Sequence, residues 1–455
     1  MSSRSWLMAA APLILTPLLA GPPPPTFAAN QAMQMQIQMQ MQMQMQMQMT
    51  RARLAAQQAQ RRRANEQAAH QKNLPPIEEV AKPGGEAWRA TLPSAGNRAE
   101  DAALVVAVGE KWLFARSRDK GLDRWTAPVE GGFESGPVIT NGLVLYTTGD
   151  YRFTALDRET GKPRYQVQLE ALRRFFSADN NKTRVQFPII DGKRVYLATY
   201  GKGQDGEAGG KLYALDLETG AKLWEAALAA GADHPPMILG DRVLVGGAPW
   251  IQAFQVADGK PLWKTYLGPS KWVSMGVVAQ GRYCLTADKL VMALDPVKGE
   301  ILWRQEVGSG VTGDDTRLFS IRTGMFGGVT LVALDPATGH PVWERKGVGS
   351  LPWVQDGRVY LAVDGAVRCL EAVDGKQVWE SPMAKPAPWP PTMVGSQLLA
   401  ACPEGKTTVL RALDPATGKE NWSFTARVKP GDGLFVADGA GILVPGKDDE
   451  LVCLK

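Results

Sequence analysis

The segment ALDPATGHPVW, at residues 333–343, decides the fold. In this segment Pro336 presets one backbone φ angle, Asp335 can accept hydrogen bonds from turn N–H groups, and Gly339 permits a positive φ. The segment therefore predicts a tight hairpin turn. Trp343 follows the glycine by four residues and opens the next strand, and we expect its large side chain to be buried against a neighbouring unit.

The same pattern recurs about every forty residues through the body of the chain. Further copies, some of them weak, lie at residues 115–125, 155–165, 214–224, 253–263, 293–303, 369–379 and 412–422. A repeat of this length indicates a propeller, a solenoid or an array. We predict that the aromatic residues of these copies are structural wedges between successive units: Trp125, Tyr165, Trp224, Trp263, Trp303, Trp343, Trp379 and Trp422.

Short apolar runs separated by tight turns precede each copy of the pattern. Residues 357–370, GRVYLAVDGAVRCL, are an example in which an Asp-Gly pair divides two alternating runs. Such runs predict antiparallel hairpins. A four-stranded sheet of forty residues cannot bury both of its faces alone, whereas radial stacking supplies a neighbour on each side. The sequence therefore predicts an all-β fold, a β-propeller of four-stranded antiparallel blades.

The number of blades follows from counting the inner-strand motifs. Eight are found, and the last, at Cys453, is followed by no motif turn. We expect the strand around Trp125 to pair with residues 450–455 and to close an eight-bladed propeller over residues 122–455. Residues 84–121 are then an N-terminal extension with additional strands. The alternative is a ninth blade, closed by Trp88.

The N-terminus has the pattern of a secretory signal peptide. Arg4 precedes an apolar stretch that ends at Ala20, and Thr26-Phe27-Ala28 gives a cleavage site, so residues 1–28 are predicted to be removed. No later segment has eighteen consecutive apolar residues, and we expect no transmembrane span. The protein is predicted to be exported, either periplasmic or secreted.

Two segments of biased composition follow the signal peptide, and we expect a disordered tail. Residues 29–50 form a Met/Gln low-complexity segment, for which a soft-cation site such as one for Cu(I), or an association strand, is the alternative. Residues 51–83 are a basic linker rich in Ala, Gln and Arg that can make weak contact with an anionic envelope surface. Beyond residue 73 the chain carries 44 basic and 45 acidic residues, so a nucleic-acid partner is not expected.

The A-x-D-x-x-T-G-x-x-x-W pattern resembles the pyrroloquinoline-quinone-type (PQQ-like) repeat family, the tryptophan-docking repeats of the quinoprotein alcohol dehydrogenase-like superfamily. The resemblance covers residues 122–455 and implies a propeller, typically of eight blades. The dehydrogenases of this superfamily carry a vicinal disulfide over the quinone and a Ca²⁺ site. Here no two cysteines are adjacent, since they are Cys284, Cys369, Cys402 and Cys453. We therefore predict no catalytic, cofactor-binding or metal-binding residue.

The function expected from these features is that of an exported, non-catalytic binding or scaffolding propeller with a protein partner, in envelope protein assembly or another protein–protein interaction. The alternative is an enzyme with a site in the axial channel, either a divergent quinoprotein dehydrogenase with PQQ and Ca²⁺, or a hydrolase or lyase. His234 lies in a loop that could face this channel.

The widest spacing between two wedge residues, from Tyr165 to Trp224, contains two insertions, at residues 171–184 and 201–210. Extra loop length is thermodynamically cheap and often carries function. Arginine and aromatic side chains are common among the residues that dominate protein interfaces. The candidate interaction residues are Arg173, Arg174, Phe175 and Phe176, and a loop packed on its own blade is the alternative.

Overall fold

The computed structural model describes residues 84–91, 98–109, 111–170, 184–202, 208–274, 276–324, 328–383, 390–427, 436–438, 441–445 and 450–455. These residues belong to one of the two compact units of the chain, Ile77–Lys455. The expected signal peptide (1–28), Met/Gln segment (29–50) and basic linker (51–83) lie outside the described residues.

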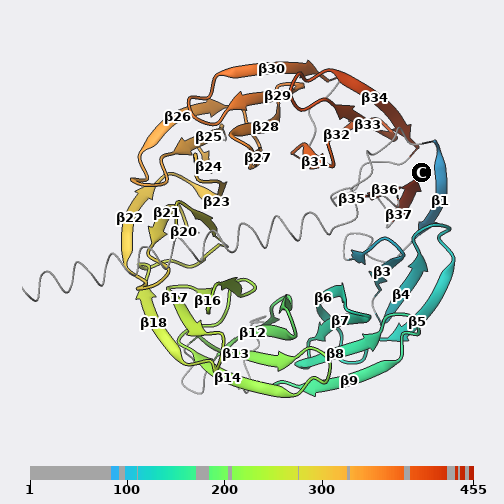
Figure 1. Ribbon diagram of the computed structural model, residues 1–455, viewed down its shortest axis with the longest axis vertical. Coiled ribbons are helices and arrows are strands. Elements are labelled where there is room, and N and C mark those ends of the chain that lie inside the picture. Colours follow the sequence, from blue (N-terminus) through green and yellow to red (C-terminus); the bar gives the residue numbers. More distant parts are fainter. Residues whose placement is uncertain are drawn as a thin grey trace, which may run out of the picture. The chain divides into compact units, whose positions relative to one another are not determined.

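Within this unit the described strands form nine antiparallel sheets arranged in a ring, and the strands of each sheet follow one another from the centre of the ring to its rim (Figure 1). From the inner to the outer strand, the first three sheets consist of β2 (Arg98–Glu100), β3 (Leu104–Val108), β4 (Trp112–Ser117) and β5 (Asp123–Pro128); of β6 (Phe133–Thr140), β7 (Leu143–Thr148), β8 (Arg152–Asp157) and β9 (Pro163–Gln168); and of β10 (Arg184–Val185) and β11 (Ile189–Asp191) beside β12 (Arg194–Lys202), β13 (Ala208–Asp216) and β14 (Lys222–Leu228). The next three consist of β15 (Met237–Leu239), β16 (Arg242–Gly247), β17 (Trp250–Gln255) and β18 (Pro261–Tyr266); of β19 (Val277–Ala279), β20 (Arg282–Ala287), β21 (Leu290–Leu294) and β22 (Ile301–Glu306); and of β23 (Ser309–Gly313), β24 (Leu318–Thr323), β25 (Val329–Leu334) and β26 (Pro341–Lys346). The seventh and eighth consist of β27 (Trp353–Gln355), β28 (Arg358–Val363), β29 (Ala366–Glu371) and β30 (Gln377–Pro382), and of β31 (Thr392–Val394), β32 (Gln397–Glu404), β33 (Thr407–Leu413) and β34 (Glu420–Ala426). The ninth consists of β35 (Val436–Asp438), β36 (Gly441–Pro445), β37 (Glu450–Leu454) and β1 (Glu86–Thr91).

The ninth sheet joins the two ends of the unit. Strand β1 pairs with β37, with Trp88 opposite Cys453 and Ala90 opposite Leu451. Beyond the strands, the N–H of Gly85 donates to the carbonyl of Lys455 at 2.9 Å, and the N–H of Lys455 donates back to Gly85 at 3.0 Å. The ring is therefore closed by hydrogen bonds between its first and last segments, and both edges of the series are paired.

The prediction of an all-β propeller is confirmed, but the prediction of eight blades is wrong, because the described residues form nine. The strand that contains Trp125 is β5, and it pairs with β4 in a complete sheet rather than with the C-terminal strand. The sheets thus begin at β1, within the segment expected to be an extension. The alternative, closure through Trp88, matches the observed pairing.

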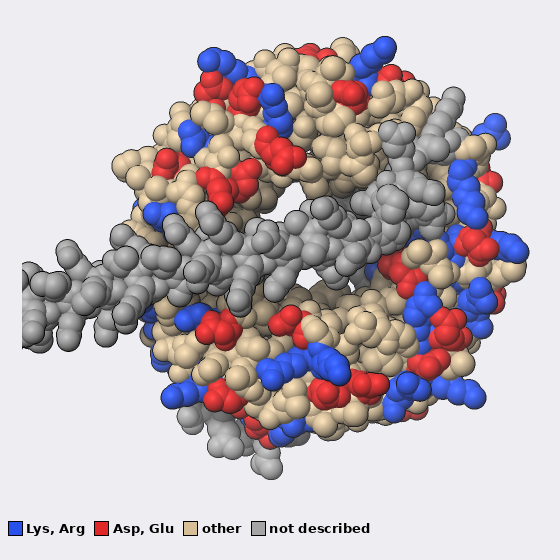
Figure 2. All heavy atoms as spheres, in the orientation of Figure 1, with Lys and Arg blue, Asp and Glu red and all other residues tan. Residues whose placement is uncertain are grey.

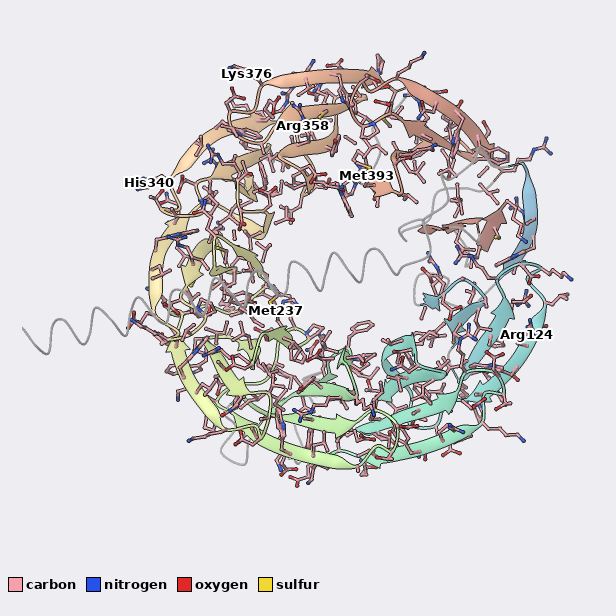
Figure 3. All side chains as sticks on the ribbon, in the orientation of Figure 1. Arg124, Met237, His340, Arg358, Lys376 and Met393 are labelled. Atoms are coloured by element: carbon pink, nitrogen blue, oxygen red, sulfur yellow. The ribbon has the colours of Figure 1, made fainter. Side chains whose placement is uncertain are left out.

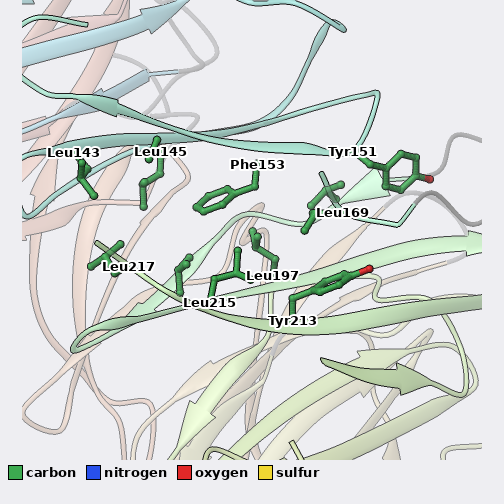
Figure 4. Packing of buried hydrophobic residues seen from close by; sticks show 12 residues of the cluster. Leu143, Leu145, Tyr151, Phe153, Leu169, Leu197, Tyr213, Leu215 and Leu217 are labelled. Atoms are coloured by element: carbon green, nitrogen blue, oxygen red, sulfur yellow. The ribbon is translucent and has the colours of Figure 1, made fainter. Parts of the chain in front are cut away.

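The core lies between neighbouring sheets. Leu143, Leu145 and Phe153 of one sheet pack with Leu197 and Leu215 of the next, and all five are at least 96% buried (Figure 4). Every residue of β7 is buried, because a sheet covers each of its faces. The middle strands are consequently near-continuous apolar runs, and burial of each leucine contributes about 2 kcal/mol.

In eight of the nine described sheets, an aromatic residue of the outer strand reaches the next sheet at the turn between its third and outer strands. The indole N–H of Trp303 donates to the carbonyl of Pro336 at 3.0 Å. A Cβ on Gly339 would lie 2.4 Å from the Trp303 ring, so only glycine leaves room for the indole. Equivalent bonds to a turn carbonyl, the one from Tyr165 through its hydroxyl, span 2.7–3.2 Å and start at Trp88, Trp125, Tyr165, Trp224, Trp263, Trp343 and Trp379.

Trp422 differs from the other aromatics of the outer strands. Its indole donates to the side-chain oxygen of Gln397, in its own sheet, at 3.0 Å. The sheet that follows is the one assembled from both chain ends, where no copy of the motif turn exists in the sequence. Trp422 is nevertheless only 8% exposed, within a cluster that includes Val452 and Leu454 of β37.

The wedge role of these aromatics predicts a large effect of truncation. Trp303→Ala should lower the free energy of unfolding by about 3 kcal/mol, since it leaves a cavity between two sheets and removes a hydrogen bond. Denaturant titration followed by circular dichroism measures the change. Trp272→Ala is the matched control, because Trp272 is 49% exposed and is not part of the motif. Equal effects of the two substitutions would contradict the wedge role.

Ring closure predicts a second result. Deletion of residues 84–91 removes β1, uncovers the edge of β37, and should lower the melting temperature and promote association. Deletion of residues 29–73 is the control. It should leave the melting temperature nearly unchanged, because the low-complexity composition of that segment does not favour a hydrophobic core. Differential scanning calorimetry and size-exclusion chromatography check both variants. Closure through β1 contributes little if the first deletion melts like the parent protein.

Candidate functional site

The candidate interaction residues Arg173, Arg174, Phe175 and Phe176 lie outside the described residues. The insertion that contains them leaves the outer strand β9 and returns to the inner strand β10 of the next sheet. The two described residues that precede it are anchored: the Leu169 N–H donates to the Tyr151 carbonyl at 2.8 Å, and the Glu170 carboxylate pairs with Lys211 at 2.5 Å. The interaction role of the four residues stays a prediction.

The motif aspartates are engaged in their turns. One oxygen of Asp216 accepts hydrogen bonds from the Thr219 hydroxyl at 2.7 Å, the Thr219 N–H at 2.9 Å and the Glu218 N–H at 3.1 Å. These bonds, that of the hydroxyl first, hold the pKa of Asp216 below its usual value. Asp157 and Asp414 make the same contacts. The recurring spacing of these carboxylates therefore serves turn geometry.

The cysteines do not fit a quinone site. Cys284, Cys369, Cys402 and Cys453 are buried free thiols that lie in four different sheets. Burial raises the pKa of the Cys284 thiol to about 12 and the pKa of Cys369 and Cys402 to about 11. A vicinal disulfide cannot form from them. Among the described residues, no three His, Cys, Asp or Glu side chains are grouped so as to hold a metal ion.

His234 lies in a loop, between β14 and β15, that other loops hold in place. The neighbouring Asp233 carboxylate accepts the N–H groups of Ala248 at 2.9 Å and Val273 at 3.2 Å. The imidazole packs edge-on against Trp272, with ring centroids 5.0 Å apart. Burial raises the pKa of Asp233 and lowers that of His234. The pair fixes a loop, and among the described residues the Nε2 atom of His234 has no hydrogen-bond partner.

Charged groups are mixed over the surface. On the face seen in Figure 2, basic and acidic side chains are interspersed without a large area of one sign. His340 and Lys376 lie on the outer rim, whereas Met237 and Met393 lie on the inner side of the ring (Figure 3). His340 is exposed in its motif turn. Among the described residues, the face seen in Figure 2 therefore offers no continuous basic area for a polyanion.

A groove of about 620 Å³ runs along the outer strand β14. Residues 225–229 form one wall, and Phe254, Gly259 and residues 261–264 of the next sheet form the other. Glu225 in this groove pairs with Lys222 at 2.7 Å and Lys211 at 2.9 Å, and these two bonds, that of Lys222 first, lower its pKa. The wall itself is built mainly from alanines.

A smaller groove, of about 210 Å³, occupies the corresponding place beside β5. It is lined by Pro128 and by Glu130 and Arg152, which pair at 3.4 Å. The two grooves share a position in the repeat, so a gap between successive outer strands is a property of the architecture. Residue size and polarity then set what each gap can admit, and the gap at β14 is the larger and the more apolar of the two.

The sequence was compared with known proteins. The repeat-family model described as "Outer membrane protein assembly factor BamB" matches residues 77–202, 174–282 and 287–411. A curated relative of that name from Burkholderia pseudomallei is 26% identical over 243 residues, 50% of this chain and 59% of that protein, so the chain spans about three-fifths of its length. The quinohemoprotein alcohol dehydrogenase ADH-IIG of Pseudomonas putida is 24% identical over 289 residues, 54% of this chain and 36% of that protein.

Among solved structures, BamB from Moraxella catarrhalis aligns with a TM-score of 0.45 and 14% identity, covering 81% of this chain and 99% of that one. The resemblance to the PQQ-like repeats is thus confirmed by the family match, which extends over well more than half of the residues. The chain belongs to the PQQ-like β-propeller repeat family whose description is outer membrane protein assembly factor BamB.

Proposed function

We propose that this protein is an exported, non-catalytic scaffold that binds a partner protein during envelope protein assembly. The observation that carries the proposal is the match of residues 77–411, in three segments, to a family described as an outer membrane protein assembly factor. The chemistry of the described residues supports it, because the motif carboxylates are engaged in turns and the thiols are buried.

The rigidity of the ring suits a scaffold. Strands buried on both faces and a hydrogen-bonded closure hold the surface loops in fixed relative positions. Partner binding to such a surface requires little ordering of the protein and therefore loses little entropy. We assign the partner contact to the insertion with Arg173, Arg174, Phe175 and Phe176, which leaves the ring at the anchored residues Leu169 and Glu170.

The location that goes with this function is the cell envelope. The signal-peptide pattern of residues 1–28 supports export, to the periplasm or beyond. Among the described residues there is no helix of the length and apolar character needed to cross a membrane. The basic linker at residues 51–83 would then supply a weak, salt-sensitive contact with an anionic surface.

Co-purification from envelope extract tests the partner assignment. The test variant has alanine in place of Arg173, Arg174, Phe175 and Phe176. The amount of outer-membrane partner that co-purifies with it should be at least tenfold lower than with the parent protein. The matched control replaces two cations and two exposed apolar residues elsewhere, namely Arg124, Lys376, Leu122 and Val373. Equal retention by both variants would place the contact outside the insertion, and absence of any outer-membrane partner would contradict the scaffold function.

The second candidate function is quinone-dependent alcohol oxidation, which the similarity to ADH-IIG favours. The positions of the four cysteines count against it, because none can supply the paired sulfurs over a quinone. With added PQQ and Ca²⁺ we expect no alcohol-dependent reduction of a dye acceptor, and no quenching of protein fluorescence by PQQ. Saturable PQQ binding together with Ca²⁺-dependent turnover would replace the scaffold by an enzyme.

A further inference from the structure

The last part of the free edge of β14, beyond Glu225, lacks the charged residues or proline that end four other outer strands of this ring. Edge strands are usually guarded by charged side chains or proline, because their unpaired backbone groups attract other strands. Here β22 and β26 carry charged residues beyond the tryptophan, and β5 and β30 end in proline. By contrast, residues 226–230, at the end of β14 and just beyond it, read AALAA.

The backbone of Ala227 points out of its sheet. Lys211, the residue opposite Ala227 in the pairing of β13 with β14, directs its N–H toward β12, where the Thr199 hydroxyl accepts it at 2.9 Å. Residues opposite each other in an antiparallel pair orient their backbone groups alike, either both inward or both outward. The N–H and carbonyl of Ala227 therefore face the free edge.

The neighbouring sheet shows that this edge can be paired. The N–H of Ala229, two residues further on and thus oriented as in Ala227, donates to the side-chain amide oxygen of Gln252 at 3.0 Å. Gln252 is buried and lies in β17 of the next sheet. An amide oxygen from outside the sheet is thus already accommodated at one end of the alanine run, next to the 620 Å³ groove.

The charges of the groove favour an acidic occupant. Glu225 is neutralised by Lys222 and Lys211, as its two ion pairs show. The Lys264 ammonium on the opposite wall lies 4.5 Å from the centroid of the Trp250 ring. Within the part of the chain that the structure describes, no carboxylate lies within ion-pair distance of Lys264. Of the two charged residues that line the groove, Glu225 and Lys264, only Lys264 has no oppositely charged partner among the described residues. A carboxylate of a bound segment could therefore pair with it.

We propose that the β14 edge takes up an extended segment of a partner protein as an additional strand, with small or aliphatic side chains in the groove and a carboxylate beside Lys264. The alanines give the incoming backbone room to approach, and the outward groups of Ala227 supply a donor and an acceptor. This inference rests on the proposed scaffold function and deepens it, since it names a site and a chemistry for a bound partner segment.

Fluorescence anisotropy with a labelled synthetic peptide tests the proposal on the full chain. The probe is a nine-residue peptide that alternates threonine and valine and has aspartate at its centre. It should bind saturably, and an analogue with alternate backbone nitrogens methylated on its pairing edge should bind at least tenfold more weakly, because methylation removes strand donors and leaves the side chains. Equal binding of the two peptides would overturn strand addition.

Variants of Ala227 locate the site. Ala227→Pro removes the outward N–H without taking a donor from the pairing with β13, and should weaken probe binding at least tenfold. Ala227→Thr keeps the N–H and should bind within about twofold of the parent protein. Lys264→Ala and a probe with asparagine at its centre should each weaken binding, with no further loss when they are combined. Unchanged binding by a folded Ala227→Pro protein would overturn the proposal.

Two further measurements keep the outcomes separate. If the near-ultraviolet circular dichroism spectrum of Ala227→Pro differs from that of the parent protein, the variant is not correctly folded. The binding of the methylated peptide and the binding of the probe to Lys264→Ala then test the proposal. If light scattering shows a dimer that Ala227→Pro abolishes, a second copy occupies the edge and the proposal is overturned. If Ala227→Pro loses peptide binding but still retains the outer-membrane partner in full, strand addition by the partner is contradicted and the scaffold function is not. The scaffold function is contradicted only when the parent protein retains no such partner.

Discussion

The contact between an aromatic ring of one sheet and the turn of the next is the interaction on which the ring depends. A single four-stranded sheet cannot cover its own apolar faces. The indole of Trp303, for instance, fills the space above Gly339 and donates to the carbonyl beside it. This contact joins eight of the nine successive pairs of described sheets, so each sheet is stabilised mainly by its neighbours, as in other repeat proteins.

The same contact explains why the fold can be predicted from the sequence. The glycine, the turn aspartate and the aromatic must keep a fixed spacing, so they stay visible when the remaining residues of a repeat vary. The number of blades is harder to predict from the sequence than the fold. The first repeat keeps few of these residues, and the turn that would precede Trp88 is replaced by the two ends of the unit. The pairing of β1 with β37 joins residues more than 350 positions apart, and no local pattern records it.

The candidate site was less accessible to sequence analysis. The alanine run at residues 226–230 is visible in the sequence, but its exposure depends on the next sheet, whose side chains leave a groove there. Likewise, the packing of His234 against Trp272 joins two loops from different sheets. In a propeller, surface chemistry is set by which loops the ring brings together, and a repeat pattern fixes the ring but not the loop sequences.

The composite sheet also imposes an order on folding. All other described sheets are continuous in sequence and can form and stack during synthesis, each on the one before it. Strand β1, by contrast, must wait until β37 arrives, so the completed circle is the final event. A chain that is cut short before β37 would remain an open arc with an unpaired edge at each end, a form that is prone to proteolysis and aggregation.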